Sequence, residues 1–319
     1  MTYDEFLDEW RSETPYIVAH TSGSTGQPKE ILLPKEMMAR SARRTIDFFG
    51  IDSDSRLHSC ISADFIGGKM MLVRSEVSGA TFSWEEPSNR PLQDFTPADR
   101  LDLVSVVPSQ MRHIVDRLEE MPRVGAYLIG GSAIHPELRQ DIVNKGIRAF
   151  ESYGMTETSS HIALRPVDSS DAPFTLLPGI SLTSDGDGCL VIDLGPDGTV
   201  ATNDLVRFCD GHRRTFRIVG RRDHVIVTGG KKVNPMEVEA AVAQLFPGVE
   251  ICVTSRPDPL WTSRVVLLAE CSPASLDAES LTLRMKQLLP SWAVPKEVIA
   301  VPALPRTASG KIIRKPLDG

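Results

Sequence analysis

The sequence predicts an α/β protein, with a large domain on a largely parallel sheet and a smaller α+β domain after it. Up to about residue 150, short apolar segments alternate with segments of helical apolar spacing, which is typical of parallel sheets. Between about Ile180 and Val219, Asp-Gly turns separate short strands, which indicates a small antiparallel β unit. A second module begins after Arg221-Arg222-Asp223 and contains a clear helix start at Asn234. We therefore expect domains at 1–220 and 221–319.

Helices and strands of the large domain alternate along the chain. The spacing predicts helices over residues 4–10, 34–49, 69–77, 109–120 and from about 136. Short β-prone segments predict strands over residues 16–19, 30–33, 57–62, 79–82, 103–107 and 127–129. In the second helix, Met37, Met38, Ala42, Ile46 and Phe49 recur at helical spacing and form one apolar face.

The small domain begins with a clear helix signal. Asn234 suits the N-cap, Pro235 the first helical position and Glu237 the third. The apolar face of this helix is expected to consist of Val238, Ala241, Val242 and Leu245. Strands over 251–255 and 265–270 and a helix over 281–289 complete a βαββα domain of about 95 residues.

Composition excludes several classes of function. The net charge of −7 over 319 residues argues against a nucleic-acid-binding protein. No apolar run approaches the roughly 20 residues of a membrane span, and the acidic N-terminus is no signal peptide. Five cysteines without CxxC spacing, and histidines without ligand pairs, predict a cytoplasmic protein with no disulfide framework and no zinc site.

The segment Thr21-Ser22-Gly23-Ser24-Thr25-Gly26-Gln27-Pro28-Lys29 lies between two expected strands. Its glycines let the backbone turn tightly and bring N–H groups toward an oxyanion, while Ser, Thr and Lys29 add donors and charge. A polar hairpin turn is the plainer alternative. The segment resembles the phosphate loop of adenylate-forming enzymes, the family of acyl-CoA synthetases, peptide-synthetase adenylation domains and luciferases. The resemblance implies that Thr21, Ser22, Gly23, Ser24, Thr25, Gly26 and Lys29 bind the phosphates of ATP.

A second segment, Ser152-Tyr153-Gly154-Met155-Thr156-Glu157, follows an expected strand and matches the family's Y-G-x-T-E motif. Ligands of α/β sheets bind at such strand ends. The resemblance implies that Ser152, Tyr153 and Gly154 contact the nucleotide. It also implies that Thr156 is catalytic through a phosphate contact, and that Glu157 is catalytic and holds Mg²⁺. Gly131 and Ser132, in a tight turn before the expected helix at about 136, are assigned to the same nucleotide site.

Two shorter motifs follow. Thr202-Asn203-Asp204 resembles the family's T-G-D segment, with Asn203 where Gly is usual, and the resemblance assigns Asp204 to the ribose hydroxyls. A turn-capping aspartate is the alternative for Asp204 alone. Gly220-Arg221-Arg222-Asp223 resembles the family's hinge, so Arg221 is expected at the ribose or phosphate and Asp223 at the pivot between domains.

The last two motifs lie in the small domain. The segment from Thr228 to Glu239 matches the family's glycine loop, which implies that Gly229 and Gly230 line the path of CoA. The segment from Pro305 to Ile312 matches P-x-T-x-S-G-K, which makes Lys311 the mobile catalytic lysine by resemblance.

The acid-binding pocket is expected in the segment from Ser62 to Arg74. Lys69 follows a glycine pair where most relatives have apolar residues, so it suits an anionic substrate tail. A solvated lysine at a helix start is the alternative. Arg74 is a weaker candidate, and His161 is a further polar one.

These motifs together predict an AMP-forming acid–thiol ligase that uses ATP, Mg²⁺ and CoA. Relatives carry a much longer segment before the phosphate loop than the 20 residues of this chain, which indicates an N-terminally truncated large domain. The short length and the cationic pocket favour the o-succinylbenzoate–CoA ligases of menaquinone biosynthesis. A ligase for another acyl or aryl acid, an enzyme that loads a carrier protein, and a non-catalytic nucleotide-binding remnant remain alternatives.

Overall fold

The computed structural model describes residues 1–21, 29–168, 172–307 and 312–318 of the chain. The chain folds into two compact units. Unit 1 comprises residues 1–181, 192–200 and 209–216, and unit 2 comprises 182–191, 201–208 and 217–319. None of the helices in the described residues is long and apolar enough to cross a membrane.

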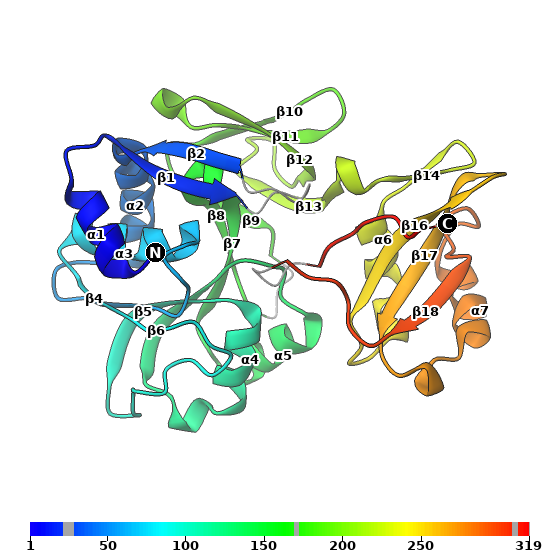
Figure 1. Cartoon of the computed structure of the whole chain (residues 1–319), viewed down its shortest axis with the longest axis horizontal. Helices are drawn as coiled ribbons and strands as arrows, with labels where there is room; N and C mark the ends of the chain where they lie inside the picture. Colours follow the sequence, from blue (N-terminus) through cyan, green and yellow to red (C-terminus); the bar gives the residue numbers. More distant parts are fainter. Residues whose placement is uncertain (22–28, 169–171, 308–311, 319) are drawn as a thin grey trace. The chain divides into compact units, whose positions relative to one another are not determined.

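A large mixed sheet is the main feature of the fold (Figure 1). Its strand order is β10-β11-β12-β13-β9-β8-β7-β6-β5-β3-β4. The strands are β3 (Arg56–Ser59), β4 (Thr81–Trp84), β5 (Arg100–Val106), β6 (Arg123–Ile129), β7 (Ala149–Met155), β8 (Ser160–Pro166), β9 (Phe174–Leu176), β10 (Ser181–Ser184), β11 (Cys189–Asp193), β12 (Thr199–Phe208) and β13 (Thr215–Arg221). From β4 to β7 neighbouring strands are parallel, whereas β8 is antiparallel to β7 and β9.

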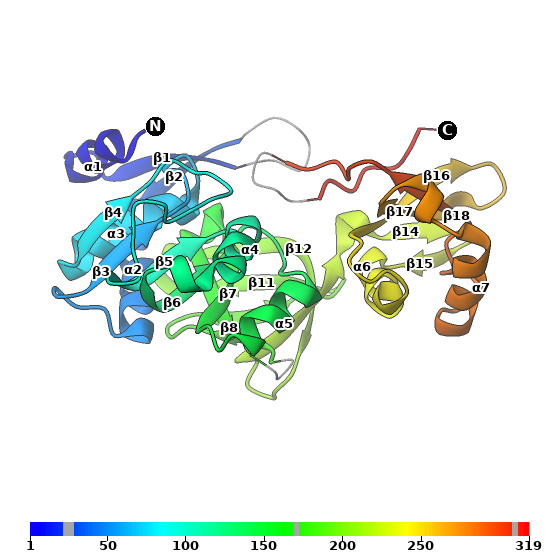
Figure 2. The same ribbon diagram turned by 90° about the horizontal axis from the view of Figure 1, so that it is seen from below.

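Helices of unit 1 form two apolar clusters. One joins α4 (Pro108–Asp116) and α5 (Pro136–Asn144) to β5 and β6. The other joins α1 (Tyr3–Arg11), α2 (Lys35–Phe49) and α3 (Ile66–Ser78) to the hairpin of β1 (Tyr16–Thr21) and β2 (Lys29–Pro34). Figure 2 shows α1 beside this hairpin. The two clusters share no residue, as expected when helices cover both faces of one sheet.

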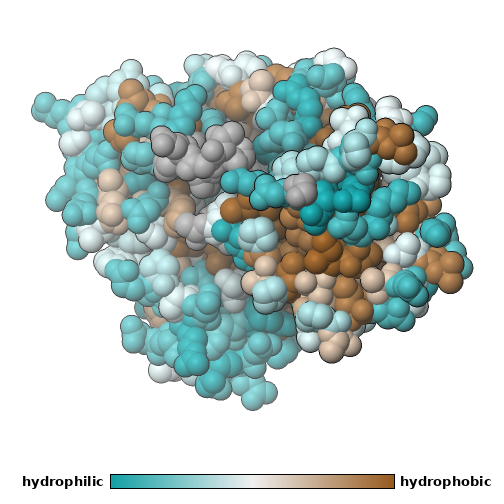
Figure 3. Space-filling view, turned by 45° about the vertical axis from the view of Figure 1, so that its right-hand side comes forward, coloured by the Kyte–Doolittle hydropathy of each residue, from teal (hydrophilic) through white to brown (hydrophobic). Residues whose placement is uncertain are grey.

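The C-terminal part of unit 2 has its own core. Its elements are β14 (Ile226–Thr228), β15 (Lys231–Val233), α6 (Pro235–Val242), β16 (Ile251–Asp258), β17 (Thr262–Glu270), α7 (Ala278–Leu288) and β18 (Glu297–Val301). β16 pairs antiparallel and β18 parallel with β17. Large apolar side chains are also exposed in this part of the chain, including Leu260, Trp261 and Trp292. Figure 3 shows apolar surface among hydrophilic residues on one face of the molecule.

Most of the elements predicted from the sequence are confirmed. Helix α6 begins at Pro235, as expected, and Asn234 is its N-cap. The Oδ1 of Asn234 accepts a hydrogen bond from the N–H of Met236 at 3.2 Å. The sequence did not predict the β14–β15 hairpin or β18. The strands of the expected small β unit, β10 to β13, lie at one end of the large sheet. Strand β3 ends at Ser59, three residues earlier than predicted.

Helix α3 begins at a close approach of backbone to backbone. A Cβ on Gly68 would lie 2.2 Å from the carbonyl oxygen of Ser62 and 2.7 Å from the hydroxyl of Tyr3. That hydroxyl donates to the carbonyl of Ile61 at 2.6 Å and is therefore fixed. At Gly67, the nearest atom to such a Cβ is a side-chain methyl of Ile61, 3.6 Å away. Only Gly68 is sterically required here.

We expect Gly68→Ala to lower the free energy of unfolding by at least about 1–3 kcal/mol, because the new methyl meets backbone that cannot yield. The matched control is Gly67→Ala, which should be neutral or stabilising by up to about 1 kcal/mol, since alanine is the better helix former. Urea titration of both variants measures the difference. Equal midpoints would show that the approach of α3 to Ser62 is not tight.

Candidate active site

The expected phosphate loop closes a β-hairpin. Thr21, the last residue of β1, pairs with Lys29, the first residue of β2, so the segment between them connects two antiparallel strands. This agrees with the prediction of a loop between strands. The loop residues Ser22, Gly23, Ser24, Thr25 and Gly26 lie outside the described residues. Both strands contact the short 3-10 turn η2 (Thr156–Thr158), which brings the base of the loop next to the second predicted motif.

The second motif lies on β7 at the end of the parallel part of the sheet. Tyr153 is buried, and its ring contacts the rings of Phe174 and Phe216 at centroid distances of 5.8 and 5.4 Å. Gly154 follows at a register shift between β7 and β8. A Cβ there would lie 2.2 Å from the carbonyl oxygen of Ser160, so only glycine fits. The aromatic contacts fix Tyr153, and the glycine lets β8 pass close behind it.

Thr156 and Glu157 lie in η2, whose conformation is stabilised by hydrogen bonds of the Thr158 side chain. The hydroxyl of Thr158 is 3.0 Å from the carbonyl of Met155 and 2.6 Å from that of Ser160. The next two residues, Ser159 and Ser160, have φ of 50° and 87°, in the left-handed region that is unusual for residues other than glycine. Backbone held in such conformations is often part of a functional site. Glu157 and Thr156 are half-buried on this rigid turn.

The predicted residues Gly131 and Ser132 are close to the same strand end. They follow β6, which pairs in parallel with β7. The hydroxyl of Ser152 donates to the carbonyl of Ile129, the last residue of β6, at 3.0 Å. Gly131 has a φ of 90°, as a tight turn after a strand requires. The carboxyl ends of β6 and β7 thus bring Gly131, Ser132 and Ser152 together, where α/β proteins bind ligands.

A buried guanidinium lies behind this strand end. Arg74, on α3, is 0% exposed. Its Nη1 is 3.4 Å from the sulfur of Met71, and its Nη2 is 3.4 Å from Ser160 Oγ and from His161 Nδ1. Its Nε has no hydrogen-bond partner, and no carboxylate of the described residues forms an ion pair with it. Burial alone lowers the pKa of Arg74 to about 9.

The geometry determines how His161 is protonated. Arginine can only donate, so Arg74 Nη2 donates to His161 Nδ1, and His161 Nε2 then donates to Thr45 Oγ1 at 3.0 Å. His161 is therefore neutral, with its proton on Nε2. Burial, together with the nearby positive charge of Arg74, lowers the pKa of His161 well below its usual value. Arg74 and His161 form one cationic group with a single positive charge.

Lys69 lies in a different environment from these two residues. It is 2% exposed, and its Nζ is 2.8 Å from the sulfur of Met1 and 4.4 Å from the centre of the Phe6 ring. Burial lowers its pKa. The alternative of a solvated lysine is wrong, since Lys69 is buried. These contacts are with Met1 and with Phe6 on α1, whereas Arg74 and His161 contact each other, so the structure does not bring Lys69 together with them. Both cations are buried, but they lie on different sides of α3, and Arg74 has no carboxylate partner among the described residues.

Within unit 2, the predicted ribose and hinge residues form one group. The guanidinium of Arg221 donates to Asp204 Oδ1 at 2.8 Å, and to both oxygens of Asp223 at 3.0 Å. Burial favours the neutral form of Asp223, but its hydrogen bonds with Arg221 outweigh this and its pKa is lowered. Asp204 is 7% exposed, and its backbone N–H donates to Thr202 Oγ1 at 3.0 Å. Arg221 thus links Asp204 of the Thr202-Asn203-Asp204 motif to Asp223 of the hinge motif.

The predicted CoA-binding glycines form a two-residue turn between β14 and β15. Gly229 and Gly230 have φ of 54° and 74°, as tight hairpins require. The N–H of Gly229 donates to the carbonyl of Trp261 at 2.9 Å, and a Cβ on Gly229 would lie 2.6 Å from the indole ring. The turn is thus held against an exposed tryptophan.

Lys311 lies outside the described residues, but its flanks are well anchored. Arg306 and Ile312 form a β-bridge, and the N–H of Ile313 donates to the carbonyl of Pro305 at 2.7 Å. Arg314 donates to Glu239 on α6 at 2.6 Å in a half-buried ion pair. The segment that carries Lys311 therefore begins and ends at fixed points of unit 2.

Comparison with known proteins identifies the family. The family model described as AMP-binding enzyme matches residues 4–184, which is more than half of the chain, and the model of the AMP-binding enzyme C-terminal domain matches residues 237–311. The chain belongs to the AMP-binding enzyme family. It is 27% identical to a 2-succinylbenzoate–CoA ligase of Listeria monocytogenes over 98% of this chain and 72% of that protein. It is 25% identical to an indoleacetate–CoA ligase of Aromatoleum aromaticum over 94% of this chain and 66% of that protein.

Solved structures give the same family and fold. An acyl-CoA synthetase (AMP-forming)/AMP-acid ligase II-like protein from Dyadobacter fermentans is 31% identical with a TM-score of 0.63, over 97% of this chain and 90% of that one. The o-succinylbenzoate coenzyme A synthetase of Bacillus subtilis, in complex with its acyl-adenylate, has a TM-score of 0.79 at 23% identity, over 93% of this chain and 67% of that one. The predicted fold class is confirmed.

Sequence reasoning missed the partners that position the candidate residues. Phe174 and Phe216 enclose Tyr153, and Thr45 and Ser160 hold the pair of His161 and Arg74. The partners of Arg74 and His161 lie on α2, α3 and β8, far apart in the sequence. No periodicity or motif indicates such contacts, because only the packing of these elements creates them.

The buried, neutral His161 makes stability depend on pH. The unfolded chain binds a proton at His161 below about pH 6.5, whereas the folded chain does not, so the free energy of unfolding falls as pH decreases below that value. The contribution is at most about 1.4 kcal/mol per pH unit for one proton. We expect urea unfolding of His161→Gln to depend less on pH between 7 and 5 than that of the parent chain. The exposed His212→Gln is the control, and equal slopes for all three proteins would contradict a neutral, buried His161.

Proposed function

We propose that this chain is an AMP-forming acid–CoA ligase, and that its acid is o-succinylbenzoate. Family membership supports adenylate chemistry, and several relatives that match over nearly the whole of this chain are 2-succinylbenzoate–CoA ligases. The observation that carries the choice of acid is the buried guanidinium of Arg74, which has no anionic partner among the described residues. This choice places the reaction in menaquinone biosynthesis, and the scattered free cysteines favour the cytoplasm.

Arg74 fits a substrate with a second carboxylate. A buried charge without a counter-charge is costly, and proteins retain one mainly where function needs it. o-Succinylbenzoate carries two carboxylates, of which the reaction activates one. The other would complete the group of Arg74, Ser160 and His161 and form charge-assisted hydrogen bonds. A substrate with a single carboxylate offers nothing to this guanidinium.

The proposed reaction has two steps. The substrate carboxylate attacks the α-phosphorus of ATP and releases pyrophosphate, and the thiol of CoA then displaces AMP. We assign the phosphates of ATP to the loop between β1 and β2, the purine to the surroundings of Tyr153, and the ribose to Asp204 with Arg221. Glu157 offers a carboxylate on a rigid turn beside that hairpin, which suits Mg²⁺, an ion that would stabilise the charge on the leaving pyrophosphate.

We further propose that residues 1–220 and 221–319 work as two domains with Asp223 at the pivot. Lys311 would serve adenylate formation, whereas the turn of Gly229 and Gly230 would serve the thiol step. Both belong to the small domain, so one orientation cannot present both to the same carbon. The small domain would alternate between two orientations in the catalytic cycle.

Pyrophosphate release over a panel of acids, with and without CoA, tests the proposed reaction. The parent chain should release pyrophosphate with o-succinylbenzoate and form thioester only with CoA. Lys311→Ala should lose most adenylate formation, since it removes a charge that acts in the transition state, yet convert preformed acyl-adenylate and CoA at a near-normal rate. Lys315→Ala is the control for loss of a nearby charge. Absence of pyrophosphate release with every acid would refute the enzyme, and equal losses in both steps would refute the alternation.

Removal of the Arg74 charge should weaken binding of the acid without lowering the stability of the protein. We expect Arg74→Met to raise KM for o-succinylbenzoate by roughly 10- to 150-fold, as for loss of a charged hydrogen bond of about 1.5–3 kcal/mol. KM for a monocarboxylic aryl acid should barely change. The free variant should be as stable as the parent or more stable, because a buried unpaired charge is gone.

Lys69→Met is the matched control on the same helix. If Lys69 faces α1 and not the acid, its variant keeps the parent KM for o-succinylbenzoate. A KM that rises for Lys69→Met and stays unchanged for Arg74→Met would assign the carboxylate to Lys69 and contradict the assignment to Arg74.

A further inference from the structure

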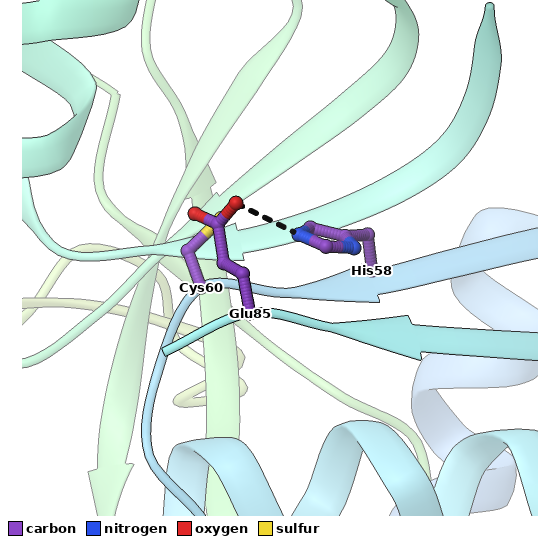
Figure 4. Close-up of side chains that lie close together, drawn as sticks. All are labelled: His58, Cys60 and Glu85. Atoms are coloured by element: carbon purple, nitrogen blue, oxygen red, sulfur yellow. Dashed lines mark ion pairs between the residues drawn. The ribbon is translucent and has the colours of Figure 1, made fainter. Parts of the chain in front are cut away.

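Three side chains that the proposed reaction does not use meet at the ends of two strands. His58 lies on β3, Cys60 directly follows β3, and Glu85 directly follows β4 (Figure 4). One ligand atom from each, namely a ring nitrogen of His58, the Cys60 sulfur and a Glu85 carboxylate oxygen, all lie within 4.8 Å of one another. His58 and Cys60 are buried at 1% and 0% exposure, and the Glu85 side chain is 16% exposed.

Strand geometry explains the meeting. Residues two apart in an extended chain point to the same side, so His58 and Cys60 share a face. β3 and β4 are parallel, with Ser59 opposite Trp84, and the N–H of Glu85 donates to the carbonyl of Ser59 at 3.3 Å. This register places Glu85 beside Cys60. The sequence alone predicted no zinc site, because the third side chain is 25 residues beyond Cys60 and only strand pairing brings it close.

The ring of His58 is oriented by a second contact. Its Nδ1 lies 2.9 Å from Ser83 Oγ, and that hydroxyl donates to the carbonyl of Leu57 at 3.4 Å. Ser83 therefore accepts from Nδ1–H, which leaves a lone pair on Nε2. His58 Nε2 is buried, has no hydrogen-bond partner in the described part of the chain, and lies 3.7 Å from Glu85 Oε2.

The carboxylate of Glu85 is held in the same way. Both of its oxygens lie within hydrogen-bond distance of the N–H of Leu92, at 3.1 and 2.9 Å. Leu92 is buried and has a φ of 64°, a conformation that costs energy for a leucine and turns its N–H toward Glu85. Such outer contacts are typical of metal sites, where they orient the residues that bind the ion.

We propose that His58, Cys60 and Glu85 bind one Zn²⁺ ion. The 3.7 Å between Nε2 and Oε2 is too long for a hydrogen bond, but two bonds of about 2.0–2.2 Å to one ion at a tetrahedral angle separate their ligand atoms by roughly 3.4 Å. Sulfur, imidazole nitrogen and carboxylate oxygen together suit zinc better than Mg²⁺ or Ca²⁺, which prefer oxygen ligands alone. A water molecule would complete the four ligands.

Charge balance supports zinc at this buried place. Binding releases the thiol proton of Cys60 to solvent, and the thiolate and the Glu85 carboxylate together cancel the two charges of the ion. The ion would join the ends of β3 and β4 and the loop that carries Leu92. It would also hold Cys60 directly before Ile61 and Ser62, whose carbonyls contact Tyr3 and the start of α3. Its role is structural, distinct from the Mg²⁺ of the proposed reaction.

Metal content of the purified chain tests the site. After expression with added zinc and dialysis, elemental analysis should find about one zinc per chain, and Cys60→Ala should reduce this at least tenfold. Cys252→Ala, which removes an equally buried cysteine of unit 2, is the matched control and should retain the zinc. Added zinc should raise Tm of the chelator-treated parent and of Cys252→Ala, but not of Cys60→Ala.

Cobalt provides a test that does not depend on a variant that folds. Co²⁺ added to the chelator-treated parent chain should give the charge-transfer absorption of a thiolate ligand, and zinc should abolish it by competition. The proposal is overturned if the parent chain retains less than about a tenth of an equivalent of zinc and shows no thiolate–cobalt absorption. It is overturned equally if Cys60→Ala and Cys252→Ala retain the same zinc.

Discussion

The proposed binding site for the free carboxylate of the acid depends on the contact between Arg74 and His161. A guanidinium with no exposure needs hydrogen-bond acceptors, and the structure supplies neutral ones from α3 and β8, while Thr45 on α2 contacts the far side of the imidazole. His161 must be neutral to accept this hydrogen bond, and its burial beside a cation keeps it neutral by lowering its pKa. The arrangement keeps a positive charge in the protein interior without an anionic partner among the described residues, and the second carboxylate of the proposed substrate would supply one.

Close backbone approaches keep this arrangement in place. Ser160 and His161 begin β8 directly after the strained turn at Ser159, and Gly154 lets that strand pass within contact of β7. The hydroxyl of Ser41 on α2 donates to the carbonyl of Ser159 at 2.7 Å and ties the turn to the helix that carries Thr45. The turn that presents Thr156 and Glu157 and the strand that presents His161 are therefore parts of one rigid segment. Nucleotide and acid sites would share this segment.

The sequence predicted much of the fold and the identity of the motifs, because these depend on local patterns. Helix α6 is an example, since its N-cap, its proline and its apolar face all lie within about ten residues. The different surroundings of Lys69 and Arg74 could not be predicted, for the opposite reason. Both lie on one apolar helix, and only the packing of α1 against Lys69 and of β8 against Arg74 distinguishes them. The same limit hid the meeting of Cys60 with Glu85, which depends on the register of two strands.

The most direct measurement of the central claim is a crystal structure of the chain with a non-hydrolysable adenylate of o-succinylbenzoic acid. We expect the free carboxylate of the ligand to bind the guanidinium of Arg74, either by a direct hydrogen bond or through one ordered water, with His161 still hydrogen-bonded to Thr45. A ligand whose free carboxylate lies in solvent or on Lys69, with Arg74 still surrounded by neutral groups alone, would contradict it.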